Sequence, residues 1–194
     1  MIAAVVLAAG TSTRLGTPKQ LLPYRGKPLI ATVVQTTSSS RVDKTVVVLG
    51  HQAEEVREAL KDFQISFVYN PDYAKGQSTS LKVGLTALSN SVDAALFVLG
   101  DQPLLQPDTV NRIIKEYSLC GRGMVAPFYR GQRGNPVLFD RIFFPKIEAL
   151  AGDTGARKII ECYYQQLIKL AVDDIGIIFD IDTWEDYCQL ISFE

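Results

Sequence analysis

Short apolar runs of strand length recur along this chain, separated by longer segments with a helical pattern. The runs are continuously apolar rather than alternating, which is typical of strands covered on both faces. They lie at residues 2–7, 45–49, 66–69, 94–99 and 124–128. Apolar residues recur at spacings of three and four in residues 29–37, 53–63, 78–88 and 107–119. This alternation predicts an α/β fold: a doubly wound, mostly parallel sheet with helices on both faces.

The second half of the chain is less regular. Residues 129–136 indicate a turn, a strand begins at residues 137–139, and residues 143–150 and 154–165 have a helical pattern. We predict a final strand at residues 175–181 and a C-terminal helix from Thr183. Because no linker or shift in composition divides the 194 residues, we expect a single domain over residues 1–194.

The charge balance narrows the classes of partner. The chain has 20 Lys and Arg against 21 Asp and Glu, so it lacks the positive surface that sequence-independent binding to nucleic acid or an anionic membrane requires. Cys120, Cys162 and Cys188 form no C-x-x-C pair, and the apolar N-terminus is too short for a membrane span. We therefore expect a cytoplasmic protein with small-molecule substrates and no nucleic-acid or membrane partner.

A polar loop follows the first predicted strand, in the sequence Leu-Ala-Ala-Gly-Thr-Ser-Thr-Arg-Leu-Gly-Thr-Pro-Lys-Gln-Leu-Leu from residue 7 to residue 22. The spacing of its glycines fits neither the dinucleotide fingerprint nor the P-loop. Ala8, Ala9 and Gly10 would let backbone N–H groups approach a polyphosphate, and Arg14 and Lys19 would neutralise its charge. The alternative is a solvated loop with ordinary surface cations.

Asp101 comes just after the predicted strand at residues 94–99, in the sequence Gly-Asp-Gln-Pro. If the strand order reverses between this strand and the first, Asp101 and Lys19 face one crevice. A carboxylate beside a triphosphate suits Mg²⁺, which binds one or two carboxylates together with substrate phosphates. The alternative is a turn aspartate that caps its loop. A second carboxylate could come from residues 179–187, where Asp180 and Asp182 would share one face of the predicted last strand.

The loop at residues 7–22 resembles the signature of the nucleotidyltransferase superfamily, which includes the molybdenum-cofactor guanylyl- and cytidylyltransferases. This resemblance implies a Rossmann-like nucleotidyltransferase fold. It also implies that the catalytic residues are Arg14, Lys19 and Asp101, and that Leu7, Ala8, Ala9 and Gly10 join them in binding the nucleotide. Asp-Ile-Asp-Thr-Trp-Glu-Asp resembles the family's ending, which makes Asp182 the second ligand of Mg²⁺, or of Mn²⁺. Trp184 stands where the family usually has proline, which leaves the helix start open.

Two further regions resemble the cytidylyltransferase branch of that family. Residues 73–84 are similar to the segment that surrounds the nucleotide base, which places Gln77, Ser78 and Ser80 there; Ser78 could instead cap a helix. Ala9 before Gly10, and Gln77 after Gly76, favour CTP over GTP. Two glycine-containing turns resemble the segments that line the pterin acceptor, and they imply an acceptor site made of Arg133, Asn135, Pro136, Asp153 and Arg157.

The resemblance therefore implies a Mg²⁺-dependent cytidylyltransferase that acts on CTP and molybdopterin, the molybdenum cofactor's pterin. Its N-terminal half would bind the nucleotide and its C-terminal half the acceptor, and a molybdenum hydroxylase would receive the product. No nucleophile elbow occurs, and the single histidine, His51, is expected to be a loop residue with no catalytic task. The alternatives are a nucleotidyltransferase that uses GTP or another phosphorylated acceptor, and a non-catalytic protein that delivers the cofactor to a hydroxylase.

Overall fold

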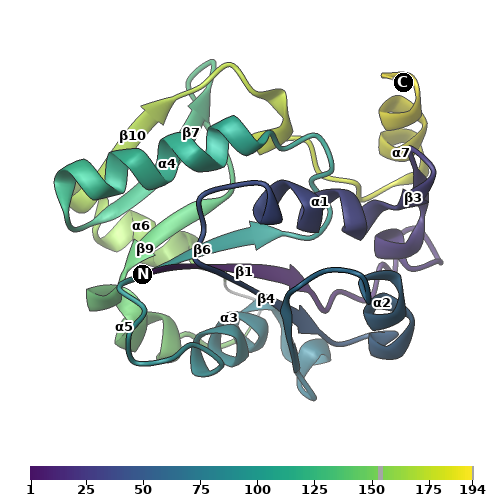
Figure 1. Ribbon diagram of the computed structural model, residues 1–194, viewed down its shortest axis with the longest axis horizontal. Helices are drawn as coiled ribbons and strands as arrows, with labels where there is room; N and C mark the ends of the chain where they lie inside the picture. Colours follow the sequence, from purple (N-terminus) through teal and green to yellow (C-terminus); the bar gives the residue numbers. More distant parts are fainter. Residues whose placement is uncertain (153–154, 194) are drawn as a thin grey trace.

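A twisted, mostly parallel sheet forms the centre of the molecule in the computed structural model, which describes residues 1–152 and 155–193 (Figure 1). All pairings along the sheet are parallel except those of β9, which is antiparallel to both neighbours, and of the short β8, which pairs with β7. The order across the sheet is β10 (Leu167–Ala171), β7 (Met124–Tyr129), β9 (Val137–Asp140), β6 (Ala94–Leu99), β1 (Ile2–Ala8), β4 (Lys44–Leu49) and β5 (Ser66–Tyr69), with β8 at Gln132–Arg133. The predicted fold class is confirmed.

Helices cover both faces of this sheet, as the continuous apolar strands require. One face packs against α1 (Leu29–Ser38), α2 (Ala53–Ala59), α4 (Pro107–Cys120) and α7 (Trp184–Ile191). The other packs against α3 (Gln77–Thr86), α5 (Phe144–Glu148) and α6 (Arg157–Cys162). In β1, Ala4 and Val6 belong to the first core and Val5 to the second, so neither side of the strand meets water.

Short elements complete the chain between these layers. A two-stranded hairpin of β2 (Pro23–Tyr24) and β3 (Lys27–Pro28) precedes α1. Single 3₁₀ turns lie at Lys19–Leu21, Tyr73–Lys75, Arg141–Phe143, Tyr164–Gln166 and Ile175–Ile177. Within the described residues, no helix has both the length and the apolar character needed to span a bilayer.

The predicted final strand at residues 175–181 is wrong. The last strand is β10, and the later segment is a 3₁₀ turn followed by irregular backbone. The sequence pattern does not reveal β10, because this strand lies half exposed at the sheet edge and contains Lys169. The later segment is apolar for another reason: Ile177 and Ile181 are fully buried in the core below α7 without joining the sheet.

Of two other helix predictions, one needs adjustment and one is confirmed. The helical pattern at residues 154–165 begins outside the described residues; within them it divides into α6 and the 3₁₀ turn at Tyr164–Gln166. The C-terminal helix begins as predicted. Thr183 is its N-cap and forms a capping box with Asp186, so Trp184 is simply the first helical residue and needs no proline there.

Gly176 lets the segment after β10 lie directly on the loop that follows β6. A Cβ atom at this position would overlap the backbone carbonyl of Leu104. We therefore expect Gly176→Ala to lower the free energy of unfolding by about 1–3 kcal/mol, as overpacking does. The exposed neighbour Ile175 is the control, because Ile175→Ala should change stability by less than about 0.5 kcal/mol. Urea denaturation measures both, and equal effects would contradict the close packing at Gly176.

Candidate active site

The loops after β1 and β6 meet at the carboxyl edge of the sheet. β1 lies between β6 and β4, so the chain leaves β1 in one direction and later returns on its other side. The order reversal that the sequence predicted is therefore present. Gly100 donates its N–H to the Leu7 carbonyl at 3.0 Å, and a Cβ atom at Gly100 would come within 2.8 Å of that oxygen. Only glycine allows the two loops to approach so closely.

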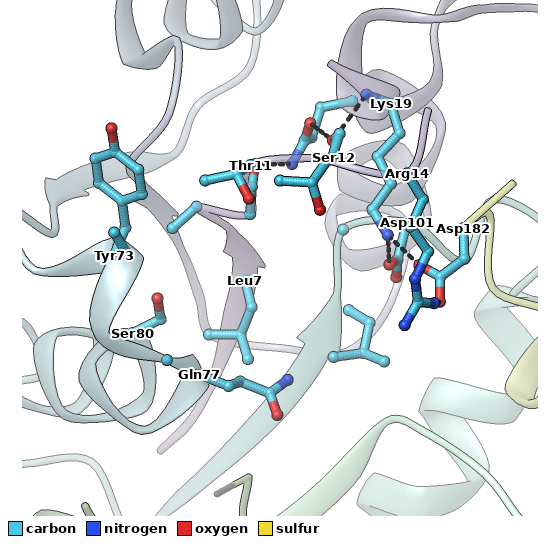
Figure 2. Close-up of a pocket in the computed structure, with 18 of the residues that line it drawn as sticks. Leu7, Thr11, Ser12, Arg14, Lys19, Tyr73, Gln77, Ser80, Asp101 and Asp182 are labelled. Atoms are coloured by element: carbon cyan, nitrogen blue, oxygen red, sulfur yellow. Dashed lines mark hydrogen bonds and ion pairs between the residues drawn. The ribbon is translucent and has the colours of Figure 1, made fainter. Parts of the chain in front are cut away.

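A cleft of about 800 Å³ opens at this edge (Figure 2). Most of the residues predicted to bind nucleotide or metal line it: Leu7, Ala9, Gly10, Arg14, Lys19, Gln77, Ser80, Asp101 and Asp182. The other lining residues were not predicted as site residues: Thr11, Ser12, Thr13, Gln20, Tyr73, Ala74, Lys75, Gly76, Leu99 and Gly100. Thr11, Ser12 and Thr13 could have been predicted to line the cleft, because they are small polar residues at the start of the glycine-containing loop.

Gln20 and Ser12 hold the loop after β1 in shape. Gln20 is buried, and its Nε2 donates to the carbonyls of Gly10 at 3.3 Å and Ala8 at 3.5 Å. The Ser12 hydroxyl accepts the N–H of Lys19 at 3.1 Å. Ala8 is itself buried and contributes this carbonyl rather than a surface to the cleft. The loop is thus preorganised by contacts within its own sequence.

Lys19 lies between two carboxylates at one end of the cleft (Figure 2). Its Nζ is 2.5 Å from Asp101 Oδ2 and 2.7 Å from Asp182 Oδ1, and its side chain is only 13% exposed. Burial alone would lower the pKa of Lys19, but the charges and hydrogen bonds of Asp101 and Asp182 outweigh it and raise the pKa above its ordinary value. Arg14 Nη1 reaches Asp182 Oδ2 at 3.2 Å from a mostly exposed position. The two cations and two carboxylates predicted from separate motifs form one cluster.

The two carboxylates suit a divalent cation. Asp101 Oδ1 is buried and has no hydrogen-bond partner among the described residues, so one oxygen of this carboxylate is left unsatisfied. Carboxylate oxygens are the ligands that Mg²⁺ and Mn²⁺ prefer. Within the described ranges, no group of three or more His, Cys, Asp or Glu side chains is arranged to hold a metal. An ion at Asp101 and Asp182 would therefore complete its coordination with water and substrate phosphates.

Asp180 and Asp182 occupy different places, because the segment that carries them is not a strand and the expected alternation does not apply. Asp182 contacts Lys19, whereas Asp180 Oδ1 accepts a hydrogen bond from Gln102 Nε2 at 2.5 Å. Burial and the nearby charges of Asp101 and Asp182 raise the pKa of Asp180 to about 6, although the Gln102 hydrogen bond and Lys19 oppose this rise. The sequence analysis does not identify Gln102.

The other end of the cleft is formed by the turn before α3 and by the start of α3. Tyr73 of the turn and Gln77 and Ser80 of the helix lie at this end, away from Lys19 (Figure 2). Ser78 does not line the cleft; it is buried and donates to the Gly152 carbonyl at 2.6 Å. The capping interpretation of Ser78 is wrong, because α3 begins at Gln77 and no side chain caps it.

None of the predicted acceptor residues that the structure describes lines this cleft. Arg133 is in β8 and is half-buried; burial and the nearby charge of Arg157 lower its pKa, against the opposing charge of Glu161. Arg157 opens α6 and its Nε pairs with Glu161 at 2.8 Å. The Asn135 N–H donates to the Ile177 carbonyl at 2.8 Å, and Pro136 is buried. Asp153 lies outside the described residues. Among the predicted acceptor residues, the charge of Arg157 acts on Arg133.

His51 lies behind the cleft rather than in its lining. Its N–H donates to the Ala9 carbonyl at 3.4 Å, and its ring meets the Tyr73 ring edge-on with centroids 6.2 Å apart. These contacts suit a residue that supports the cleft wall.

Comparison with known proteins agrees with this geometry. A family model described as the MobA-like NTP transferase domain matches residues 4–170. Nicotine blue oxidoreductase of Paenarthrobacter nicotinovorans is 31% identical and covers 98% of this chain and 96% of its own length. Molybdenum cofactor cytidylyltransferase of Escherichia coli is 26% identical and covers 94% of this chain and 92% of its own length.

Solved structures show the same fold. Rv0371c from Mycobacterium tuberculosis superposes with a TM-score of 0.89 at 34% identity, over 98% of this chain and 97% of its own. The same protein in complex with manganese superposes with a TM-score of 0.84 at 32% identity, over 98% of both chains. The family model matches most of the chain, and these relatives are similar to it over nearly their full length. The chain therefore belongs to the MobA-like NTP transferase family, and it is a nucleotidyltransferase.

Proposed function

We propose that this nucleotidyltransferase moves a cytidylyl group from CTP to the terminal phosphate of a molybdenum cofactor. The observation that carries the proposal is the single cleft in which Lys19 joins Asp101 and Asp182 at one end while Gln77 and Ser80 lie at the other. A triphosphate at the first end would place the base near the second. The end-to-end similarity to the Escherichia coli cytidylyltransferase supports CTP and the pterin acceptor.

The nucleotide-binding roles follow from position. Backbone N–H groups at Ala9 and Gly10 approach the phosphates without obstruction from side chains, and Lys19 and Arg14 neutralise their charge. Leu7, Gln77 and Ser80 contact the nucleoside; Ala8 and Ser78 support these groups from beneath. The acceptor lies beside Arg133 and Arg157, with Asn135 and Pro136 around it; the resemblance also assigns Asp153 to acceptor binding. In this proposal the N-terminal half holds the nucleotide and the C-terminal half the acceptor.

The reaction is an in-line displacement. An oxygen of the acceptor phosphate attacks the α-phosphorus of CTP, a new P–O bond forms, and the bond to the β-phosphate oxygen breaks to release pyrophosphate. Bound at Asp101 and Asp182, Mg²⁺ or Mn²⁺ would neutralise charge that develops on the phosphates. The positive charge of Lys19 stabilises the negative charge on the leaving pyrophosphate. The preorganised loop orients the triphosphate. Catalysis is thus positioning and electrostatic stabilisation.

A pyrophosphate-release assay with CTP, GTP, ATP or UTP and molybdopterin as acceptor tests this proposal. We expect kcat/KM for CTP to exceed that for GTP by at least about tenfold, the discrimination that a few pocket contacts supply. Turnover with GTP but not CTP would overturn the nucleotide assignment. Turnover only with another phosphorylated acceptor would overturn the pterin.

One further outcome of this assay distinguishes an enzyme from a non-catalytic protein that delivers the cofactor. Tight molybdopterin binding without pyrophosphate from any nucleotide would indicate a delivery protein, and intact Lys19 and Asp101 in one cluster argue against this result. If transfer occurs, we propose that a molybdenum hydroxylase receives the product.

A further inference from the structure

Within the cluster formed by Lys19, Asp101 and Asp182, Asp182 is the member carried by irregular backbone. Lys19 lies in the 3₁₀ turn Lys19–Leu21, and Asp101 lies in the turn two residues after β6. Asp182 lies in irregular backbone between the Ile175–Ile177 turn and α7. Its distance from Asp101 therefore depends on the hydrogen bonds that hold the residues on either side of it.

Gln102 joins the loop that carries Asp101 to the segment that carries Asp182. Its side chain is fully buried, and its Nε2 donates both to the Ile177 carbonyl at 3.0 Å and to Asp180 Oδ1 at 2.5 Å. Beside it, the Ile181 N–H donates to the Asp101 carbonyl at 3.1 Å. Two of these three hydrogen bonds come from one side-chain amide, and together they hold the residues just before Asp182.

The chemistry of this contact requires an amide. The two acceptors, a carbonyl and a carboxylate, need two N–H groups from a neutral side chain; an ionised glutamate would donate none and would repel Asp180. Gln102 Oε1 is buried and has no hydrogen-bond partner among the described residues. A buried acceptor without a partner costs stability. The glutamine is thus poorly explained by core packing and well explained by its two donors.

An independent contact holds the other side of Asp182. Asp186 Oδ2 accepts the N–H groups of Asp182 at 3.0 Å and Thr183 at 2.8 Å. With this anchor in place, loss of the Gln102 contacts would let the segment shift without detaching from α7. A shift of about 1 Å is enough to weaken a preorganised site substantially.

We infer that Gln102 is a positioning residue: through Asp180 and the Ile177 carbonyl it sets the place of Asp182 opposite Asp101, and with it the affinity of the site for a divalent cation. This role rests on the metal site of the proposed function. Gln102 does not line the cleft and touches no substrate. It acts only through the segment that it holds.

Mn²⁺ binding to the full chain without nucleotide tests this inference, with free Mn²⁺ measured by electron paramagnetic resonance. We expect Gln102→Met to weaken Mn²⁺ binding by about tenfold or more, as loss of an outer contact to a metal ligand does. We expect no further loss when Gln102→Met is added to Asp182→Asn. A merely structural role would not produce this dependence on Asp182.

Thr36→Val is the matched control. The Thr36 hydroxyl is buried and donates to the Leu105 carbonyl at 3.1 Å, three residues beyond Gln102, without contact to residues 177–182. This variant should lower Tm and leave Mn²⁺ affinity unchanged. Wild-type affinity in Gln102→Met, additive losses in the double variant, or equal weakening by Thr36→Val would each overturn the inference. Because the measurement involves neither CTP nor an acceptor, a wrong substrate assignment leaves its outcome unaffected.

Discussion

Asparagine in place of Asp101 is expected to lower kcat for nucleotidyl transfer by about three orders of magnitude, the effect of removing a central electrostatic group. Asp101 Oδ2 accepts from Lys19 at 2.5 Å, and its Oδ1 is buried without a hydrogen-bond partner among the described residues. The amide has the same shape but neither the charge nor the second acceptor oxygen. Steady-state pyrophosphate release at several Mg²⁺ concentrations measures the loss.

A control variant separates this effect from a general change in charge. Asp62 is exposed and lies outside the lining of the cleft, so Asp62→Asn removes one negative charge without touching the site. Its activity should match wild type. Unfolding of Asp101→Asn should remain cooperative, with Tm reporting that the fold is intact. Activity of Asp101→Asn within tenfold of wild type, at an unchanged Mg²⁺ requirement, would remove Asp101 from the metal site.

Methionine in place of Lys19 should change two measurements in opposite directions. Turnover should fall by about 10²- to 10³-fold, because the cation that faces the triphosphate is lost. Binding of Mn²⁺ without nucleotide should become tighter by at least about tenfold, because the ammonium no longer competes for the two carboxylates. That competition follows from the Nζ distances of 2.5 Å to Asp101 and 2.7 Å to Asp182.

Arg14 supplies the comparison for Lys19. Its side chain is 73% exposed and reaches only Asp182, at 3.2 Å. Solvent screens such an exposed pair, so Arg14→Met should tighten Mn²⁺ binding much less than Lys19→Met. Unchanged or weaker Mn²⁺ binding in Lys19→Met would show that the ammonium does not occupy the cation position.

The sequence predicts the central part of the fold well because its strands are strongly patterned. β1, β4 and β6 are buried on both faces, and burial on both faces leaves the continuous apolar run that sequence analysis detects. β10 is half exposed at the sheet edge, so it carries no such run. Residues 175–181 contain an apolar run but form no strand. A segment that is buried in the core is apolar whether or not its backbone pairs with another strand. Hydrophobicity reports burial, and only pairing partners decide strand or turn.

The candidate site divides in the same way. Lys19 and Asp101 could be paired from sequence because each lies in a loop that follows a strand, and the order of strands places both at one edge. Gln102 could not be found in this way: its function depends on Asp180 and Ile177, which are 78 and 75 residues further along the chain. The capping interpretation of Ser78 fails because a serine near a helix start fits a local pattern, whereas its hydroxyl donates to the Gly152 carbonyl, 74 residues further along the chain.

The sequence by itself determined the class of fold, the family resemblance and the glycine-containing loop after β1 as the candidate nucleotide site, because these depend on local patterns of burial, glycine and charge. The tertiary structure decided that Lys19 lies between Asp101 and Asp182, and that Gln102 holds the segment leading to Asp182. Such contacts join residues far apart in the chain. Their distances are set by how the loops pack against each other, and no local pattern encodes that packing.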